Sequence, residues 1–216
     1  MYNVCMKKTT VKVTKVLSEE DLQVLYEYCL YDDADVELAK NVRSAVIQSG
    51  NARYNYKFAC DIEGADIKAH GEAVIKSGNA EYNYKFAHLI EGADIKAHGE
   101  AVIQSGNARY NYKFAHDIKG ADIKAHGEAV IKSGDANYNC FFAHNVKGAD
   151  IKAHGEAVIQ SGDAGYNYKF ARWIEGADVA MHKEVYDPTE AKKKVLTLQQ
   201  RTEQILDRIS HSPNCQ

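Results

Sequence analysis

Histidine is the residue type in this sequence most able to do chemistry, and it recurs in two columns. One column has a histidine every 28 residues, and a second column lies earlier in three of the same copies. Because neutral imidazoles bind metal ions and relay protons, stacked histidines could do either. The first column is His70, His98, His126, His154 and His182, and the second is His88, His116 and His144.

A metal site at these histidines is disfavoured by geometry. Zinc needs three or four ligands within about 2.0–2.3 Å of one point, whereas packed helices stand ~8–10 Å apart. The first column also falls inside the apolar arc of its helix. We therefore expect structural, hydrogen-bonded histidines, no metal and no cofactor, and we keep a metal-binding or enzymatic role of the histidine columns as a minor alternative.

Asparagine forms a similar ladder in the middle of another apolar arc. A buried amide is costly unless its hydrogen bonds are satisfied. We predict that these side chains bind turn backbone or the histidines of a neighbouring hairpin. The members of the ladder are Asn55, Asn83, Asn111, Asn139 and Asn167.

Enzymatic function finds little support in the motifs. The sequence has no GxSxG, phosphate-binding loop, HExxH or dinucleotide-binding fingerprint. A catalytic site requires one unique constellation, and nearly every residue here exists in four or five copies. We therefore expect a protein that is not an enzyme and has no catalytic residues.

Composition excludes several further classes. The 216 residues carry a net charge of −3, which disfavours nucleic acid as a partner. Five cysteines without a CxxC pair favour a reducing, cytoplasmic location. No apolar run approaches ~18 residues, so we expect no membrane association.

The elements that position these residues follow a repeat of 28 residues. The unit reads SG[ND]AxYNYKFAxxIxGADIKAHGEAVI, and near-identical copies fill residues 51–178. In the first copy, Asn51 and Asp66 are suited to cap helices over about 52–63 and 67–77, which Gly64 and Gly78 would end. Each unit is therefore predicted to be a helical hairpin.

Such short helices cannot bury their apolar faces alone, so the predicted fold is all-α, an α-solenoid of stacked helical hairpins. The array spans residues 51–186. Residues 18–50 form a degenerate capping copy, in which Tyr26 aligns with Tyr54. Residues 1–17 form an N-terminal segment with a short strand at 9–16. Residues 187–216 form an amphipathic helix and tail.

The apolar stripe of this C-terminal helix has two interpretations. It either seals the last repeat as a long capping helix or forms the seam of a homodimer. Trp173 would belong to the cap if it were buried under this helix. The candidate oligomerisation residues are Val195, Leu198, Ile205 and Ile209.

Positions at which the copies disagree are the candidates for partner binding. Most map to the polar face of the first helix of each hairpin, where neutral drift is one explanation. Leu89, Phe141 and Trp173, however, are large apolar residues on a predicted solvent face, which is typical of binding hot spots. The candidate residues are Arg53, His88, Leu89, Arg109, His116, Phe141, His144, Arg172 and Trp173.

The motif YNYKFAxxIxGADIKAHGEAVIxSG resembles the tandem helical-hairpin repeats of uncharacterised bacterial and phage proteins. Those repeats share the skeleton FA…GADI…AVI…SG. The resemblance implies an α-solenoid and a bacterial or phage setting. It implies no activity and no functional residues.

Together these observations favour a non-enzymatic protein-binding or scaffold module that presents an extended solenoid surface to an unidentified protein partner. The alternative is a phage or mobile-element inhibitor that binds a host defence protein through the same surface.

Overall fold

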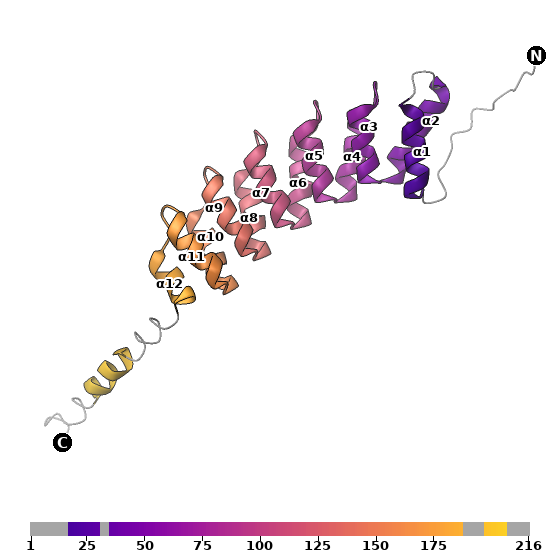
Figure 1. Cartoon of the computed structure of the whole chain (residues 1–216). Coiled ribbons are helices and arrows are strands. Elements are labelled where there is room, and N and C mark those ends of the chain that lie inside the picture. Colours follow the sequence, from indigo (N-terminus) through magenta and orange to yellow (C-terminus); the bar gives the residue numbers. More distant parts are fainter. Residues whose placement is uncertain (1–16, 31–34, 188–196, 207–216) are drawn as a thin grey trace, which may run out of the picture. The chain divides into compact units, whose positions relative to one another are not determined.

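A computed structural model describes residues 17–30, 35–187 and 197–206, and these ranges contain helices and no strand (Figure 1). The strand predicted at 9–16 lies outside the described residues. The helices are α1 (Glu19–Cys29), α2 (Val36–Ser49), α3 (Ala52–Asp61), α4 (Ile67–Ser77), α5 (Ala80–Leu89), α6 (Ile95–Ser105), α7 (Ala108–Asp117), α8 (Ile123–Ser133), α9 (Ala136–Asn145), α10 (Ile151–Ser161), α11 (Ala164–Trp173) and α12 (Val179–Tyr186).

Each hairpin begins and ends as its sequence predicts. At the start of α5, the backbone N–H of Tyr82 donates to Oδ1 of Asn79 at 3.1 Å. Gly106 closes α6 with a φ of +65°, a conformation that glycine adopts without steric cost. The first helix of each hairpin is shorter than expected. For example, α3 ends at Asp61 and not at the predicted stop Gly64, because the chain is extended at Ile62, whose side chain is buried in the core.

The chain forms two compact units, which we call the first unit (residues up to Ala129) and the second unit (from Val130 onward). Within the first unit, α3 packs on α4 and α5, and α4 packs on α6. Within the second unit, α9 packs on α10 and α11, and α10 packs on α12. This repeated pairing of neighbouring hairpins confirms the predicted α-solenoid of helical hairpins.

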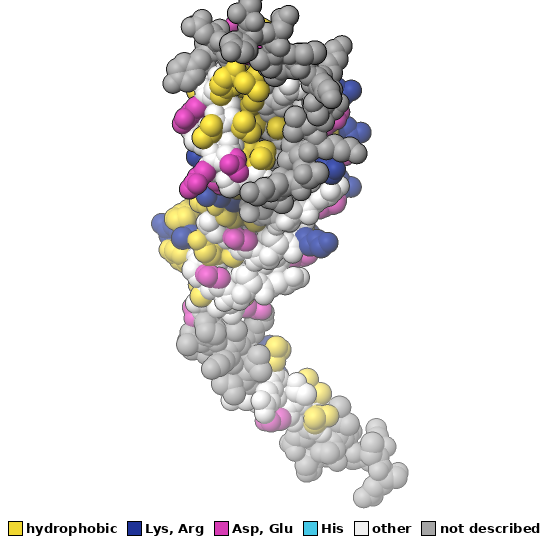
Figure 2. Space-filling view, turned by 90° about the vertical axis from the view of Figure 1, so that its right-hand side faces the viewer, with side chains coloured by type: hydrophobic (Ala, Val, Ile, Leu, Met, Phe, Trp, Pro, Cys, Tyr) yellow, Lys and Arg dark blue, Asp and Glu magenta, His cyan; other side chains and the backbone are white. Residues whose placement is uncertain are grey.

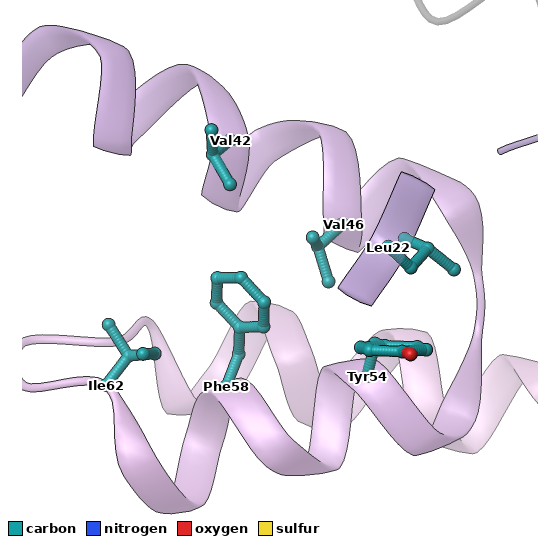
Figure 3. Close-up of a cluster of buried hydrophobic side chains, with 6 residues drawn as sticks. All are labelled: Leu22, Val42, Val46, Tyr54, Phe58 and Ile62. Carbon is teal, nitrogen blue, oxygen red and sulfur yellow. The ribbon is translucent and has the colours of Figure 1, made fainter. Parts of the chain in front are cut away.

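From α3 onward, the core of each hairpin is built around one fully buried phenylalanine. Phe58 of α3 points toward Val42 and Val46 of α2, and Tyr54 and Leu22 lie beside them (Figure 3). The equivalent phenylalanines at 86, 114, 142 and 170 are all at most 1 % exposed.

The asparagine ladder is satisfied by three hydrogen bonds at each step. In one hairpin, Nδ2 of Asn83 donates to the carbonyl oxygens of Val74 (3.1 Å) and Asn79 (2.9 Å). Since both amide hydrogens point at carbonyls, Oδ1 is left to accept from Nδ1 of His98 at 2.8 Å. One asparagine therefore joins both helices of its hairpin to the hairpin before it.

The same network recurs along the chain and refines the sequence prediction. The histidine belongs to the same hairpin as its asparagine, not to a neighbouring one, and turn backbone is bound as well. The other pairs are Asn55–His70, Asn111–His126, Asn139–His154 and Asn167–His182.

Replacing Asn111 with alanine should lower the free energy of unfolding by at least about 2 kcal/mol. The change leaves Nδ1–H of His126 and two carbonyls without their partner in a buried site, and each unsatisfied buried group costs ~1–3 kcal/mol. Urea denaturation followed by circular dichroism measures this. Asn137→Ala, at a half-exposed position of α9, is the control and should change stability by under about 0.5 kcal/mol. Equal losses in both variants would contradict the network.

A glycine in each second helix lets the next hairpin come close. A Cβ on Gly71 would lie 3.3 Å from Cε1 of Phe86 and 3.4 Å from Nε2 of His98, whose rings stack at 4.7 Å. In α2, Arg43 stands where the 28-residue period predicts this glycine. At that site the ring centres of Phe58 and His70 are 5.6 Å apart. The closer stacking of 4.7 Å is therefore found where the facing helix has a glycine.

Gly99→Ala should destabilise the protein by about 1 kcal/mol. Its Cβ would lie 3.2 Å from Cε1 of Phe114, and overpacking of ~1–3 kcal/mol exceeds the ~1 kcal/mol gained in helix propensity. Gly165→Ala lies on the exposed side of α11, and its Cβ would lie 3.3 Å from Oδ1 of Asp163. Because every other copy carries a side chain at this position, the change should stabilise through helix propensity. In urea denaturation the two variants should change the free energy of unfolding in opposite directions. Stabilisation by both changes would contradict the packing role of Gly99.

The first hairpin differs in register from the alignment of Tyr26 with Tyr54. Tyr26 donates its hydroxyl to Oδ2 of Asp61 at 2.6 Å, and Tyr84 makes the same bond to Asp117 at 2.5 Å. Because Tyr84 is equivalent to Tyr56, the alignment was off by two residues.

The first hairpin also has an exposed apolar side. Val24, Leu30, Val36 and Leu38 are all exposed, and hydrophobic side chains lie among acidic ones on the face toward the viewer in Figure 2.

The role of the C-terminal helix as a cap stays a prediction. Residues 197–206 are helical, but all of them are exposed, including Leu198 and Ile205. Lys183 stands 28 residues after Gly155, so the last hairpin lacks the glycine against which a further element would pack. Val195 and Ile209 lie outside the described residues, and the homodimer seam stays a prediction.

Candidate binding surface

The variable positions lie on the outer sides of the first helices. All nine candidate residues are exposed. We call those on α3, α5 and α7 the first-unit face: Arg53, His88, Leu89, Arg109 and His116. Those on α9 and α11 form the second-unit face: Phe141, His144, Arg172 and Trp173.

The three large apolar candidates are exposed, as the helical pattern predicts. Leu89 is 59 %, Phe141 44 % and Trp173 57 % exposed. Among the described residues nothing buries Trp173, and its place in a cap with the C-terminal helix stays a prediction.

Several charges on the helices of the first-unit face are paired. Nζ of Lys85 lies 2.6 Å from Oε1 of Glu81, and this hydrogen bond lowers the pKa of Glu81. Asp117 accepts from Tyr84 and lies 2.6 Å from Nδ1 of His116. Burial raises the pKa of Asp117, but these two hydrogen bonds outweigh it and hold the pKa below its usual value.

Tyrosine rings under the lysines are a feature that the sequence interpretation missed. Nζ of Lys57 lies 4.5 Å from the ring centre of Tyr26, and Nζ of Lys113 lies 5.4 Å from that of Tyr84. These lysines are only half-exposed and cross from one hairpin to the one before it. The recurring YNYK motif is a signal that could have indicated such cation–π pairs.

The second-unit face departs from this arrangement. Phe141 occupies the lysine position, and Cys140 occupies the position of the preceding tyrosine. The Cys140 thiol lies 3.8 Å from the carbonyl oxygen of Tyr166, and burial raises its pKa to about 12. This thiol is therefore unsuited to nucleophilic chemistry.

Neither histidine column offers a metal site in the part of the chain that is described. The first column is buried, and burial lowers the pKa of His98 and His126 to about 4. The second column is exposed on the candidate faces. No group of three histidine, cysteine, aspartate or glutamate side chains converges within the described ranges, and none of their helices is long and apolar enough to cross a bilayer.

Shallow grooves also run between successive second helices. In the first unit a groove of about 330 Å³ is lined by Ile95, Gly99, Ile103, Phe114 and His126, among others. A smaller groove of about 260 Å³ lies between α10 and α12. The first-unit groove is lined mostly by residues common to the copies and by the Lys96–Glu100 pair, 4.0 Å apart, whereas the second groove adds Met181, where the other copies have alanine. The first-unit groove therefore offers little that is specific to one copy.

Comparison with known protein families, with curated proteins and with solved structures found no match.

Proposed function

We propose that this protein is a non-enzymatic protein-binding module that uses the outer sides of its first helices. The observation that carries the proposal is the exposure of Leu89, Phe141 and Trp173 at positions where other copies have polar residues. In a near-uniform array, contacts specific to one partner must come from the positions that differ. Large exposed side chains at such positions are typical hot spots.

Neutral drift explains this pattern less well. Drift on a solvated helix face exchanges polar residues for one another, as at position 53 and its equivalents. The equivalents of Leu89 and Trp173 include Asp61 and Asp117, both of which accept hydrogen bonds from tyrosines. Replacing a bonded carboxylate with exposed apolar bulk loses a bond without burying the new side chain.

Restoring the polar repeat residues tests the proposal. The triple variant Leu89→Asp, Phe141→Lys, Trp173→Asp carries side chains that the fold already accepts elsewhere, so its stability should change little. A tagged wild-type chain should capture a specific protein from a bacterial lysate, and the variant should lose at least about 2 kcal/mol of that affinity. Quantitative mass spectrometry and titration with the purified partner measure both.

A matched control uses the opposite side of the hairpins. Lys96→Gln and Lys152→Gln remove exposed lysines of α6 and α10 and should retain the partner. If these control changes abolish capture while the triple variant binds normally, the binding surface is on the second helices and the proposal is wrong.

The identity of the captured protein also separates the two interpretations of the module. The bacterial or phage setting implied by the repeat motif leads us to use a bacterial lysate. A host defence protein as the captured partner would favour the phage or mobile-element inhibitor over a general scaffold.

A further inference from the structure

We propose that residues 1–16 of this chain cover the leading edge of the array, by which we mean the exposed side chains Val24, Val36 and Leu38 of the first hairpin. The segment itself lies outside the described residues. The leading edge is separate from the two candidate binding faces. The proposal rests on the position of the three side chains, on charge, and on the point at which the segment joins α1.

Val24 lies on the side of α1 from which a preceding hairpin would approach. It is equivalent to Tyr54, because Tyr26 is equivalent to Tyr56. In later copies this position contacts the hairpin before it. The hydroxyl of Tyr54 donates to a glutamine side chain of α1 at 3.0 Å, and the ring centre of Tyr82 lies 5.8 Å from that of Tyr56. The described chain has no hairpin before α1, and Val24 is 65 % exposed.

Val36 and Leu38 place α2 on the same edge. At a spacing of 28 residues they correspond to Gly120 and Asp122, which line the groove that faces α6 of the preceding hairpin. Two exposed aliphatic side chains thus replace a glycine and a capping aspartate. The end repeats of a solenoid normally turn a polar surface to solvent. An apolar edge therefore indicates that a further segment covers it.

The charge of the first hairpin complements that of residues 1–16. Residues 17–50 hold eight acidic and two basic side chains, whereas residues 1–16 hold four lysines and no acidic side chain. Two exposed carboxylates flank the leading edge: Glu20 stands one helical turn before Val24, and Glu37 lies between the two edge residues of α2. Opposite charges on the two surfaces favour their contact.

The pattern within residues 1–16 suits an apolar edge. Val11 and Val13 flank Lys12, in the stretch for which the sequence predicts a short strand. Alternate side chains of a strand face opposite sides, so both valines can lie on the edge while Lys12 faces solvent. Such a segment buries the apolar edge and restores a polar outer surface.

The segment also begins beside the surface that it would cover. Leu17, the first described residue, is half-buried and packs against the core of the first hairpin. An extended chain spans ~3.3–3.6 Å per residue, so the six residues back to Val11 reach about 20 Å, which is about the length of α2 at ~1.5 Å per residue. Because the segment is attached, its docking is intramolecular and its effective concentration is high.

The other end of the chain and a second copy fit this edge less well. Residues 188–216 hold three acidic and five basic side chains, so their charge is nearly balanced. A second copy stacked head to tail would bring α12 to the edge. There Lys183 stands where α4, α6 and α10 have the glycine that permits close packing.

Trypsin cleavage of the full chain tests the proposal, because Lys12 lies between the two valines. A protease cuts a docked segment only when that segment detaches. Cleavage after Lys12 should be at least about tenfold slower in the full chain than in a free synthetic peptide of residues 1–18. Mass spectrometry of samples taken over time gives the rate at each lysine separately.

Two changes at the edge should release the segment. Leu38→Asp introduces the side chain that the repeat has at this position, and Val24→Gln tests the edge from α1. Each should raise the rate of cleavage after Lys12 at least about fivefold, because less apolar surface is buried by docking, and should leave the circular dichroism at 222 nm unchanged. Raising salt to about 0.5 M should raise the rate relative to that of the free peptide, because the charges are then screened.

Leu89→Asp is the matched control. It removes an exposed leucine from a later hairpin and also introduces a residue that the repeat has at that position. The rate of cleavage after Lys12 should stay within about twofold of the wild-type rate, since changes at exposed sites without special contacts have small effects.

Four results would overturn the proposal. The first is cleavage after Lys12 that is as fast in the full chain as in the free peptide, and the second is slow cleavage that neither edge variant accelerates. The third is accelerated cleavage after Lys192, Lys193 or Lys194 in the edge variants in place of Lys12, which would make the C-terminal segment the occupant. The fourth is self-association of the wild-type chain in sedimentation that Leu38→Asp abolishes without changing cleavage after Lys12, which would make a second copy the occupant.

Discussion

Lowering the pH from about 7 to about 5 should strongly destabilise the helical array while most carboxylates are still charged. The cause is the buried histidine column. Burial lowers the pKa of His70, His98, His126 and His154 to about 4, against about 6.5 when the chain is unfolded, and it lowers that of His182 as well.

The sign follows from which state binds protons more tightly. The unfolded histidines take up protons below about pH 6.5, whereas the folded ones remain neutral until about pH 4. Stability is therefore greatest above pH 6.5 and falls as the pH decreases through this window. Each pKa unit corresponds to about 1.4 kcal/mol, so several histidines acting together approach the 5–15 kcal/mol that typically holds a domain folded.

The structural reason is that a protonated imidazole carries a hydrogen on both ring nitrogens, and the site offers a hydrogen-bond acceptor to only one of them. Nδ1 already donates to the asparagine amide, and in His70, His98 and His154 the buried Nε2 lacks any hydrogen-bond partner. Each column histidine feels the capping aspartate of its own helix, such as Asp94 for His98, which opposes the shift but does not cancel it. Arg43 faces His70 from α2 and adds to the lowering of its pKa.

Urea denaturation at a series of pH values, followed by circular dichroism at 222 nm, measures this effect. The slope of the free energy of unfolding against pH should show that the chain takes up several protons when it unfolds. His126→Gln should reduce the slope by about one proton, and Asn137→Ala, which keeps every histidine, should leave it unchanged. If the free energy of unfolding were the same at pH 7.5 and pH 5, the first histidine column could not be buried and neutral as assigned.

Truncating Phe114 to alanine should cost about 3–5 kcal/mol of stability. Its side chain is fully buried, packs with Val102 and Ile118 and stacks on His126 with ring centres 4.7 Å apart. The surrounding helices belong to two hairpins, so the cavity cannot close by the movement of one of them. Denaturation by urea at pH 7.5 gives the free energy of unfolding.

The neighbouring residue is the matched control for Phe114. Lys113 lies half-exposed over the ring of Tyr84, and a cation–π contact at such a site is worth ~0.5–1 kcal/mol. Lys113→Ala should therefore cost about 0.5 kcal/mol, several times less than the phenylalanine change. Comparable losses in the two variants would show that the buried and exposed sides of α7 are assigned wrongly.

The sequence alone determined the features that depend on near neighbours in the chain. The caps at Asn79 and Asp94, the stop at Gly106 and the burial of Phe114 were predictable because capping bonds and helical faces are set within three or four residues. The exposure of Leu89 and Trp173 followed from the same helical period. A period of 28 residues then required each hairpin to pack on its neighbours.

Only the tertiary structure decided which residues meet between helices. The pairing of Asn83 with His98 in one hairpin, the placement of Lys113 over Tyr84, and the register of Tyr26 all depend on how helices lie against each other. The exposure of residues 197–206 was equally invisible in their amphipathic pattern. A periodic pattern says that an apolar face exists, but not what lies against it, because that depends on the distance and angle at which separate helices pack.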